Sequence, residues 1–370
     1  MTISASDLHR RAIIVDGHCD TPYRLFRHNV HLDEHDPEAQ ADLRSLQESG
    51  ITATFFASYV PPAYAGRGAA DFARLLIDVI ETEARRRPDS VVLCTGSKGI
   101  RDAKRDGKLA LMIGVEGGHA IEDSLDILRE LYDRGARYLT LTHVNTNNWC
   151  DSSGDAPRHN GLTDFGRDVV RNMNDLGMIV DISHVSDPAY YAVLETTRVP
   201  VVATHSSCRA ICNHPRNMTD DMLRDLARNG GVCMINFFSA FISNDVAQAM
   251  KNAAKPAKGS GLGGTEEMPD DRTDWDTYLA WFNSLGMPRA TLDQVADHVI
   301  HAAEVAGIDH VGIGSDFDGV PALPDGLTDA GMLPALTARL SERGMRDDDI
   351  EKVLGSNFMR VFEAVERARR

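Results

Sequence analysis

The sequence lacks an excess of basic residues, and this absence excludes several classes of partner. It contains 39 Lys and Arg against 55 Asp and Glu in 370 residues, which gives a net charge of −16. A surface of that sign repels phosphate groups, so we expect neither nucleic acid nor an anionic membrane surface as a partner. With 42% hydrophobic and 25% charged residues, the composition also excludes collagen-like, coiled-coil and disordered chains.

Paired cysteines and hydrophobic terminal segments are also missing. The six cysteines are scattered without a CxxC pair, as free thiols in a reducing compartment are, so structural disulfides are not indicated. Residues 1–11 are polar and lack the apolar core of a signal peptide, and the last residues form no hydrophobic tail. We therefore expect a soluble cytoplasmic protein without a membrane anchor.

Short apolar runs rich in β-branched residues recur along the whole chain. Near-continuous runs of this kind are typical of parallel strands buried on both faces, and the intervals between them are long enough for crossover connections. The eight predicted strands are residues 12–15, 51–60, 109–115, 138–142, 178–182, 200–204, 231–237 and 310–313.

Helical periodicity fills several of the intervals between these runs. Apolar residues follow one helix face up to Gly135 and again up to Gly177, and Thr291 with Gln294 forms a capping-box pair ahead of a helix that stops at Gly307. Eight alternations of strand and helix predict a single (β/α)8 barrel domain over residues 1–370, of the α/β class. The alternative is an open doubly wound sheet, but no glycine-rich phosphate-binding motif follows the first strand.

The longest interval separates the seventh and eighth predicted strands, and we expect an insertion at about 239–290. Residues 255–264 resemble a flexible loop, and aromatic residues follow at Trp275, Tyr278, Trp281 and Phe282. The insertion is either a lid over the barrel mouth or a surface excursion with one packed helix.

Polar residues follow six of the eight predicted strands. They are His18 and Asp20, Glu116 with His119, His143, His184, His205, and Asp316 with Asp318. In a barrel the carboxyl ends of the strands converge on one mouth, where the active sites of this architecture lie.

This group contains the ligand types of a metal site. His18 and Asp20 are two residues apart on an extended chain, so they share one side while Cys19 faces the other. His184 and His205 follow adjacent strands and form a second pair, and Glu116 can bridge two metals through its two oxygens. Nitrogen and oxygen ligands together suit Zn²⁺, with Mn²⁺ or Co²⁺ as substitutes. A single histidine on a strand is more often a hydrogen-bonded core residue, but five such groups packed together without a metal would leave buried charges unpaired.

Seven motifs resemble the membrane (renal) dipeptidase family, zinc dipeptidases of the amidohydrolase superfamily. In chain order they are VDGHCD (15–20), GVEGGH (114–119), YLTLTH (138–143), DISHVS (181–186), THSS (204–207), PRNM (215–218) and GSDFDG (314–319). The resemblance implies two Zn²⁺ per chain, one on His18 and Asp20 and one on His184 and His205, with Glu116 shared.

The resemblance also implies the roles of three further residues. Asp316 falls on the acid/base aspartate, His143 on the substrate histidine and Arg216 on the arginine that binds the substrate carboxylate. We expect a hydroxide bridging the metals to attack the peptide carbonyl, with Asp316 taking and returning the proton and His143 stabilising the oxyanion. The substrate is then a small dipeptide with a free C-terminal carboxylate, and the family also implies a possible homodimer. Asp318 and His119 are expected to be hydrogen-bonding neighbours rather than ligands.

Two other functions compete with this one. Another hydrolase of the superfamily acting on a small amide typically opens with HxH or carries a lysine after the fourth strand, where this chain has HCD and His143. A catalytically silent peptide-binding barrel is the second, and the intact residue set from His18 to Asp316 argues against it.

Overall fold

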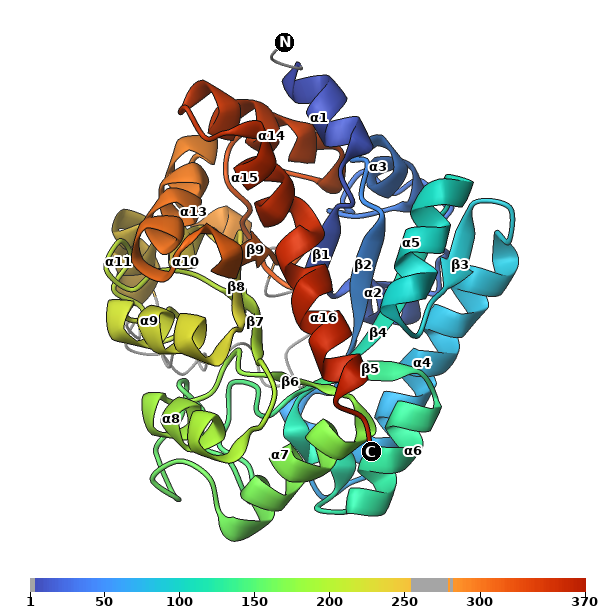
Figure 1. Cartoon of the computed structure of the whole chain (residues 1–370), viewed down its shortest axis with the longest axis vertical. Helices are drawn as coiled ribbons and strands as arrows, with labels where there is room; N and C mark the ends of the chain where they lie inside the picture. Colours follow the sequence, from blue (N-terminus) through green and yellow to red (C-terminus); the bar gives the residue numbers. More distant parts are fainter. Residues whose placement is uncertain (1–3, 254–278, 280–281) are drawn as a thin grey trace.

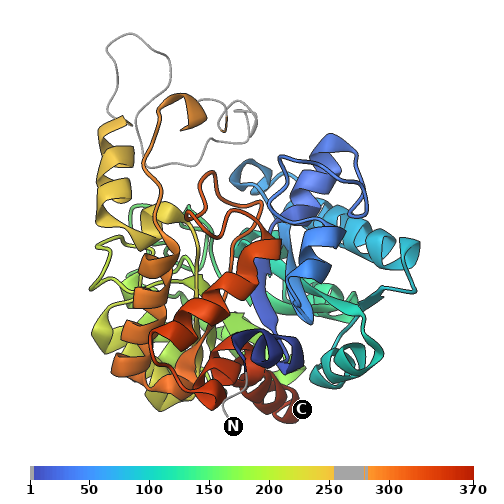
Figure 2. The same ribbon diagram turned by 90° about the horizontal axis from the view of Figure 1, so that it is seen from above.

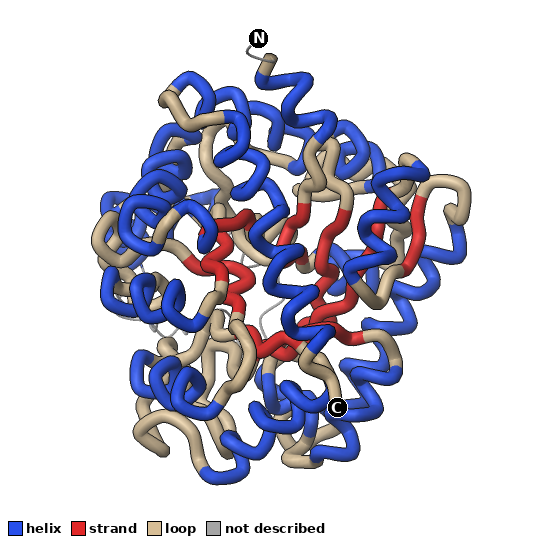
Figure 3. Tube along the Cα trace, viewed as in Figure 1, coloured by secondary structure: helices blue, strands red, loops and turns tan. Residues whose placement is uncertain are grey.

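Parallel strands surrounded by helices form the body of the protein, in a computed structural model that describes residues 4–253, 279 and 282–370 (Figures 1 and 3). The strands are β1 (Val15–Cys19), β2 (Ala53–Tyr59), β3 (Val91–Leu93), β4 (Leu109–Glu116), β5 (Ala136–Thr140), β6 (Ile179–Asp181), β7 (Val202–Ser206), β8 (Val232–Ile235) and β9 (Val311–Ile313). The α-helices are α1 (Ala5–Arg11), α2 (Thr21–His28), α3 (Leu43–Glu48), α4 (Ala69–Arg86), α5 (Ser97–Asp106), α6 (Leu125–Asp133), α7 (Asp164–Leu176), α8 (Asp187–Thr196), α9 (Asp220–Asn229), α10 (Ser239–Ile242), α11 (Asn244–Ala253), α13 (Leu292–Ala306), α14 (Leu333–Glu342), α15 (Asp347–Glu351) and α16 (Asn357–Arg367). Short 3₁₀ turns η1 (Pro62–Tyr64), η2 (Gly118–Ile121), η3 (Ile308–His310) and η4 (Ala330–Met332) and a π-helical segment η5 (Lys352–Ser356) complete the described elements.

The sheet closes on itself. β1 pairs in parallel with both β2 and β9, and β2 pairs directly with β4 over seven residues, Ala53–Tyr59 against Ala110–Glu116. The pairing then runs through β5, β6, β7 and β8 to β9. Eight parallel strands therefore form a closed α/β barrel, which confirms the predicted fold and excludes the open doubly wound sheet.

Two details of the predicted strands are wrong. The first strand begins at Val15, not at Ala12, so it includes Asp16 and His18. Both polar side chains are accommodated inside the barrel because each has a hydrogen-bonding partner there, Ser315 for Asp16 and Tyr138 for His18.

The second error is the short strand β3, which the sequence analysis missed. It pairs with Leu109–Leu111 at the start of β4, whereas β5 pairs with the end of β4. Since β2 occupies the other edge of β4, β3 lies outside the barrel. Three residues are too few for a run of alternating or continuous apolar residues to be recognised.

The predicted helix boundaries are confirmed where capping residues define them. Thr291 and Gln294 form a capping box at the start of α13, and Gly307 follows its last residue. Gly177 ends α7 with a φ of 75°, the left-handed conformation that glycine adopts without strain.

Helix α16 closes the amino end of the barrel. It crosses the strands in Figure 1, and its Phe358 and Phe362 pack on Phe55 of β2 with ring centroids 5.3 and 6.3 Å apart. Phe55, Tyr138, Phe358 and Phe362 belong to one buried cluster inside the barrel. With this end filled by apolar side chains, the polar residues gather at the opposite end, where the strands terminate.

Helices α10, α11 and α13, which lie between β8 and β9 in the chain, are on one side of the barrel (Figure 2). Of the aromatic residues predicted in the insertion, Phe282 is buried, and Trp275, Tyr278 and Trp281 lie outside the described residues.

All six cysteines are free thiols, as predicted, and the structure shows that all six are buried. Over the described ranges, no helix is both long and apolar enough to cross a membrane.

Candidate functional site

The carboxylate of Glu116, the last residue of β4, lies between two sets of histidines at the carboxyl end of the barrel. Its Oε2 is 3.4 Å from His18 Nε2, while its Oε1 is 3.1 Å from His184 Nε2 and 3.3 Å from His205 Nε2. His143 Nε2 is 4.0 Å from the same Oε1. The two oxygens of one buried carboxylate thus face two different groups of ligand atoms.

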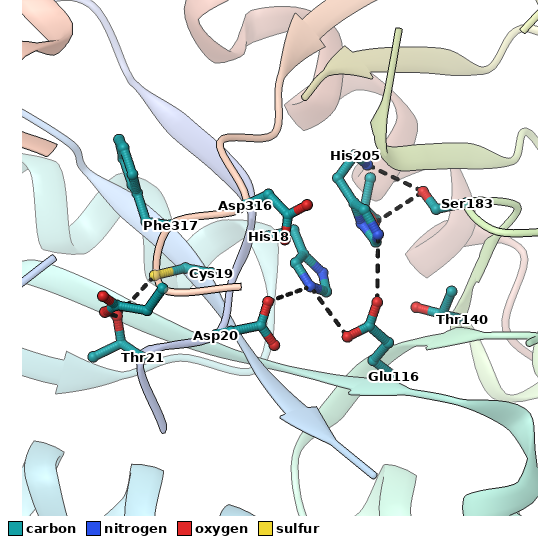
Figure 4. Close-up of polar contacts among 12 residues, drawn as sticks. His18, Cys19, Asp20, Thr21, Glu116, Thr140, Ser183, His205, Asp316 and Phe317 are labelled. Carbon is teal, nitrogen blue, oxygen red and sulfur yellow. Dashed lines mark hydrogen bonds and ion pairs between the residues drawn. The ribbon is translucent and has the colours of Figure 1, made fainter. Parts of the chain in front are cut away.

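His18 and Asp20 face the centre from the end of β1, and Cys19 points the other way, toward Thr21 (Figure 4). His18 Nε2 is 3.2 Å from Asp20 Oδ2, and a second carboxylate, that of Asp316, lies within 4.8 Å of these ligand atoms. The alternation predicted from the two-residue spacing is therefore present.

Tyr138 of β5 fixes the orientation of the His18 ring. Its hydroxyl is 2.8 Å from His18 Nδ1, so the ring's other nitrogen, Nε2, faces Asp20 and Glu116. The phenol ring occupies the space above Gly114, where an added Cβ would lie 1.9 Å from the ring. A glycine in β4 is thus a condition for the contact between Tyr138 and His18.

Asp181, the last residue of β6, fixes the orientation of His205. Its Oδ1 accepts hydrogen bonds from the backbone N–H groups of Ser183 and Thr204, and its Oδ2 accepts from the hydroxyls of Thr140 and Thr204. Since the Thr204 hydroxyl donates to Asp181, it can only accept from His205 Nδ1, 2.8 Å away.

This hydrogen bond determines which nitrogen of His205 is free. Nδ1 carries the proton, and in the neutral ring Nε2 presents a lone pair. That lone pair faces Glu116 Oε1 and His184 Nε2, which is 2.8 Å away. Lone pairs and a carboxylate that converge in this way repel one another unless a cation lies among them.

Burial sets the charge states of three histidines. It lowers the pKa of His143 to about 4, and it lowers the pKa values of His184 and His205 as well, despite the attraction of Glu116. These rings are therefore neutral at neutral pH, which is the form that binds metals.

The carboxylates of Asp20 and Glu116, in contrast, are stabilised by a nearby positive charge. Burial raises the pKa of Asp20 to about 8, and Glu116 and Asp316 add to the effect. Burial lowers the pKa of His18, but Tyr138, Glu116 and Asp20 together outweigh it and hold that pKa well above its ordinary value. A cation beside Asp20 and Glu116 relieves this imbalance.

The donor set therefore fits metal binding. The described residues contain three groups of buried ligand atoms, and within each group the atoms lie within 4.8 Å of one another. The groups are His18, Glu116 and His205; Glu116, His143 and His184; and His18, Asp20 and Asp316. Within the same residues, Asp20 Oδ1, His143 Nδ1 and His184 Nδ1 are buried without a hydrogen-bond partner. Imidazole nitrogens with carboxylate oxygens form the ligand chemistry of Zn²⁺ and similar ions.

Asp316 follows β9 in a left-handed backbone conformation, with a φ of 65°. Its Oδ2 accepts a hydrogen bond of 2.7 Å from Nδ2 of Asn236, which follows β8. Its other oxygen, Oδ1, faces Gly319, where an added Cβ would lie 2.5 Å from it and 2.1 Å from Asp20 Oδ2. The absence of a side chain at 319 is what lets the two carboxylates approach each other.

Arg216 lies beside the metal-ligand groups and belongs to none of them. Its Nη2 donates to the backbone oxygen of His205 at 3.1 Å, and the guanidinium lies 5.3 Å from the ring centre of Phe241. The side chain is buried, its Nε has no hydrogen-bond partner, and no carboxylate of the described chain forms a salt bridge with it. Burial lowers the pKa of Arg216 to about 10, and Asp316 and Glu116 oppose this effect.

His119 and Asp318, expected to be hydrogen-bonding neighbours, are outside the three ligand groups. His119 Nε2 is 3.3 Å from the backbone oxygen of Pro61, and Asp318 accepts from Thr21 and from the backbone of Gln40.

Five residues that shape the site received no role in the sequence analysis, although all but one lie in the quoted motifs. They are Gly114, Tyr138, Asp181, Asn236 and Gly319. The polar signal that could have revealed Asn236 is a buried amide placed at the end of the predicted seventh strand, in an otherwise apolar run.

A closed α/β barrel with histidines and carboxylates converging at its carboxyl end is typical of metal-dependent hydrolases. The curated protein Dipeptidase verJ from Clonostachys rogersoniana is 36% identical over 375 residues, covering 95% of this chain and 84% of that protein. The crystal structure of the probable dipeptidase PvdM from Pseudomonas aeruginosa matches with a TM-score of 0.84 and 26% identity over 98% of both chains. A dipeptidase described as a metallopeptidase of family M19 matches with a TM-score of 0.77 and 25% identity over 95% of this chain and 98% of its own.

The family model for membrane dipeptidases, peptidase family M19, matches residues 3–370. The chain belongs to this family, a family of dipeptide-hydrolysing metallopeptidases, and the resemblance seen in the motifs is confirmed.

Proposed function

We propose that this protein is a binuclear zinc dipeptidase that cleaves dipeptides with a free C-terminal carboxylate. The observation that carries the proposal is the position of Glu116, whose Oε2 faces His18 and whose Oε1 faces His184 and His205. A carboxylate shared in this way can serve two adjacent metal ions, one on each oxygen.

Two pairs of side chains would hold the ions, with Glu116 common to both. His18 and Asp20 form one pair, and His184 and His205 form the other. When bound, the two Zn²⁺ ions supply a water molecule activated for attack near neutral pH and polarise the peptide carbonyl.

Asp316 would move the proton. Its carboxylate lies within 4.8 Å of the ligand atoms of His18 and Asp20, close enough to take a proton from an attacking water molecule and to return it to the departing amine. The bond from Asn236 engages Oδ2, and Oδ1 lies on the side of Asp20.

His143 would stabilise the negative charge that develops on the carbonyl oxygen. Since burial lowers its pKa to about 4, the ring is neutral at neutral pH and carries one N–H donor. Its Nε2 lies 4.0 Å from Glu116 Oε1, at the edge of the ligand cluster, and its Nδ1 has no hydrogen-bond partner in the described chain. A donor placed beside the reacting carbonyl stabilises the oxyanion more than the ground state.

Arg216 would bind the substrate's carboxylate. A buried guanidinium without a carboxylate partner is unfavourable, and a dipeptide's C-terminus supplies that partner with bidentate geometry. A longer peptide has no carboxylate at this position, so the same contact would limit the enzyme to dipeptides.

The test compares one dipeptide with its C-terminal amide on the wild type and on Arg216→Ala. Truncating one partner of a desolvated charge pair costs about 2–5 kcal/mol, so kcat/KM for the free dipeptide should fall by about 30-fold or more. The amide, which never forms the pair, should lose much less. Arg216→Lys is the matched control, because it keeps the charge but not the planar fork, and it should recover only part of the loss.

Two results would contradict the proposal. One is a wild type that cleaves the amide as fast as the acid, which would remove Arg216 from substrate recognition. The other is elemental analysis that finds one zinc or none per chain after reconstitution at neutral pH.

A further inference from the structure

Asn236 touches the carboxylate of Asp316 from the end of the neighbouring strand β8, and nothing in the metal-ligand set explains its presence. We propose that Asn236 is a positioning residue, which fixes the orientation of the Asp316 carboxylate for proton transfer. This inference rests on the proposed function, in which Asp316 moves the proton. According to this inference, the hydrogen bond from Asn236 determines which oxygen of Asp316 faces the reacting atoms.

The orientation of the Asn236 amide is determined by its surroundings. Its Oδ1 accepts a hydrogen bond from the backbone N–H of Phe238 at 2.5 Å, a contact that only the oxygen can make. The NH₂ group must then face Asp316, where it donates to Oδ2 at 2.7 Å. The backbone is fixed as well, because Asn236 N–H donates to the oxygen of Ser206 and the Ser207 hydroxyl donates to Asn236 O. The side chain is fully buried.

Asp316 needs an external support of this kind. Its backbone has a φ of 65°, in a region where non-glycine residues are uncommon and conformations persist only when neighbours enforce them. The amide is neutral, so it orients the carboxylate without adding a second charge to the centre.

The hydrogen bonds of the buried aspartates differ in a way that matches their proposed tasks. Asp181 accepts two hydrogen bonds on each oxygen and is fully engaged, as a structural anchor is. Asp316 accepts the Asn236 bond on Oδ2, and its Oδ1 lies on the side of Gly319 and Asp20. One oxygen held by an amide and the other directed toward the ligand cluster is the arrangement expected of a group that exchanges a proton.

The experiment measures kcat, KM and zinc content for Asn236→Ala and Asn236→Asp. The aspartate variant keeps an oxygen for the Phe238 N–H but replaces the amide donor with a second carboxyl group beside Asp316. Displacing a reacting group by about 1 Å can cost about 100-fold, so kcat should fall by about 10- to 100-fold. KM should stay within about threefold, because substrate binding is assigned to other residues, and zinc content should remain at the wild-type level.

Asn217→Ala is the matched control. Asn217 is also a buried asparagine, but its amide donates to the backbone oxygens of Cys212 and Phe241 in the loop that carries Arg216. Its loss should raise KM rather than lower kcat. A purely structural role for Asn236 would instead change both parameters, or the zinc content, together.

A double variant separates this inference from the proposed function. If Asn236 acts through Asp316, then adding Asn236→Ala to Asp316→Asn should change the residual rate by less than about twofold. A further large loss in the double variant overturns the inference. The inference is also overturned if Asn236→Ala and Asn236→Asp both fail to fold. If Asp316→Asn turns over normally, the proposed role of Asp316 fails. If Asp316→Asn is inactive while both Asn236 variants are normal, only the inference about Asn236 fails.

Discussion

Gly319 provides a direct test of the distance between the carboxylates of Asp20 and Asp316. A Cβ at this position would lie 2.1 Å from Asp20 Oδ2 and 2.5 Å from Asp316 Oδ1, whereas side-chain Cβ contacts essentially never fall below 3.0 Å. In Gly319→Ala, Asp20 Oδ2 must therefore move by about 0.9 Å and Asp316 Oδ1 by about 0.5 Å. Such overpacking of a dense interior typically costs about 1–3 kcal/mol of stability.

The functional effect should match the upper end of the effect on stability, because a 100-fold loss corresponds to about 2.7 kcal/mol. A shift of about 1 Å in a reacting group can cost about 100-fold, so we expect kcat/KM to fall by about that factor. Moving a proposed ligand should also weaken zinc binding by about 10- to 100-fold, by analogy with changes that misorient ligands. Zinc affinity is measured by competition with a chromophoric chelator, and kcat/KM by dipeptide hydrolysis on the reconstituted enzyme.

Gly331→Ala is the control for the added methyl group. Its nearest neighbour would be Asp329 Oδ1 at 3.0 Å, the end of a partly exposed side chain that can move. This variant should keep the activity and zinc affinity of the wild type. If Gly319→Ala also keeps both, the two carboxylates do not depend on the space that glycine leaves, and this prediction is wrong.

Two further predictions concern buried residues outside the metal-ligand groups. Tyr138→Phe keeps the ring above Gly114 but removes the hydroxyl that holds His18 Nδ1, so zinc affinity should fall by about 10- to 100-fold in the chelator assay, and an unchanged affinity would argue against this support. His298 accepts from Cys208 N–H through Nδ1 and lies 3.0 Å from Ile242 O through Nε2, and burial lowers its pKa from 6.5 to about 4. The unfolded state then binds the proton first as the pH falls, so this stabilisation is complete above pH 6.5 and is lost toward pH 4; from pH 7 to 5 it amounts to about 2 kcal/mol. In urea unfolding, His298→Gln should lose about 2 kcal/mol less than the wild type over that interval, and equal losses would contradict the assignment.

Much of the site can be predicted from the sequence because its residues lie at the carboxyl ends of the barrel strands. Once the strands are recognised, a polar residue at each carboxyl end must lie near the others, whatever the separation along the chain. This is why Glu116, His184 and His205 could be expected to meet, and the structure brings them within 3.1–3.3 Å of Glu116 Oε1. Their roles as zinc ligands remain predictions.

The error in the first strand has a different physical cause from the missed strand β3. Sequence periodicity identifies strands by apolar side chains, so a strand is read as ending where a carboxylate appears. In β1 the polar residues Asp16 and His18 continue the strand because Ser315 and Tyr138 satisfy them inside the barrel. Such compensation depends on residues 120 to 300 positions away and leaves no local pattern.

The residues that orient the side chains of the site were not predicted, for a related reason. The sequence shows which side chains gather at the barrel mouth, but the direction of each lone pair depends on hydrogen bonds between strands. His205 presents Nε2 to the centre because Asp181 fixes the Thr204 hydroxyl, and Asp316 presents Oδ1 because Asn236 holds Oδ2. In both cases the atom that faces the ligand cluster is selected by a partner on an adjacent strand. We therefore expect activity at this mouth to depend on the register of the barrel as much as on the identity of the proposed ligands, so that substitutions that preserve every proposed ligand still reduce it.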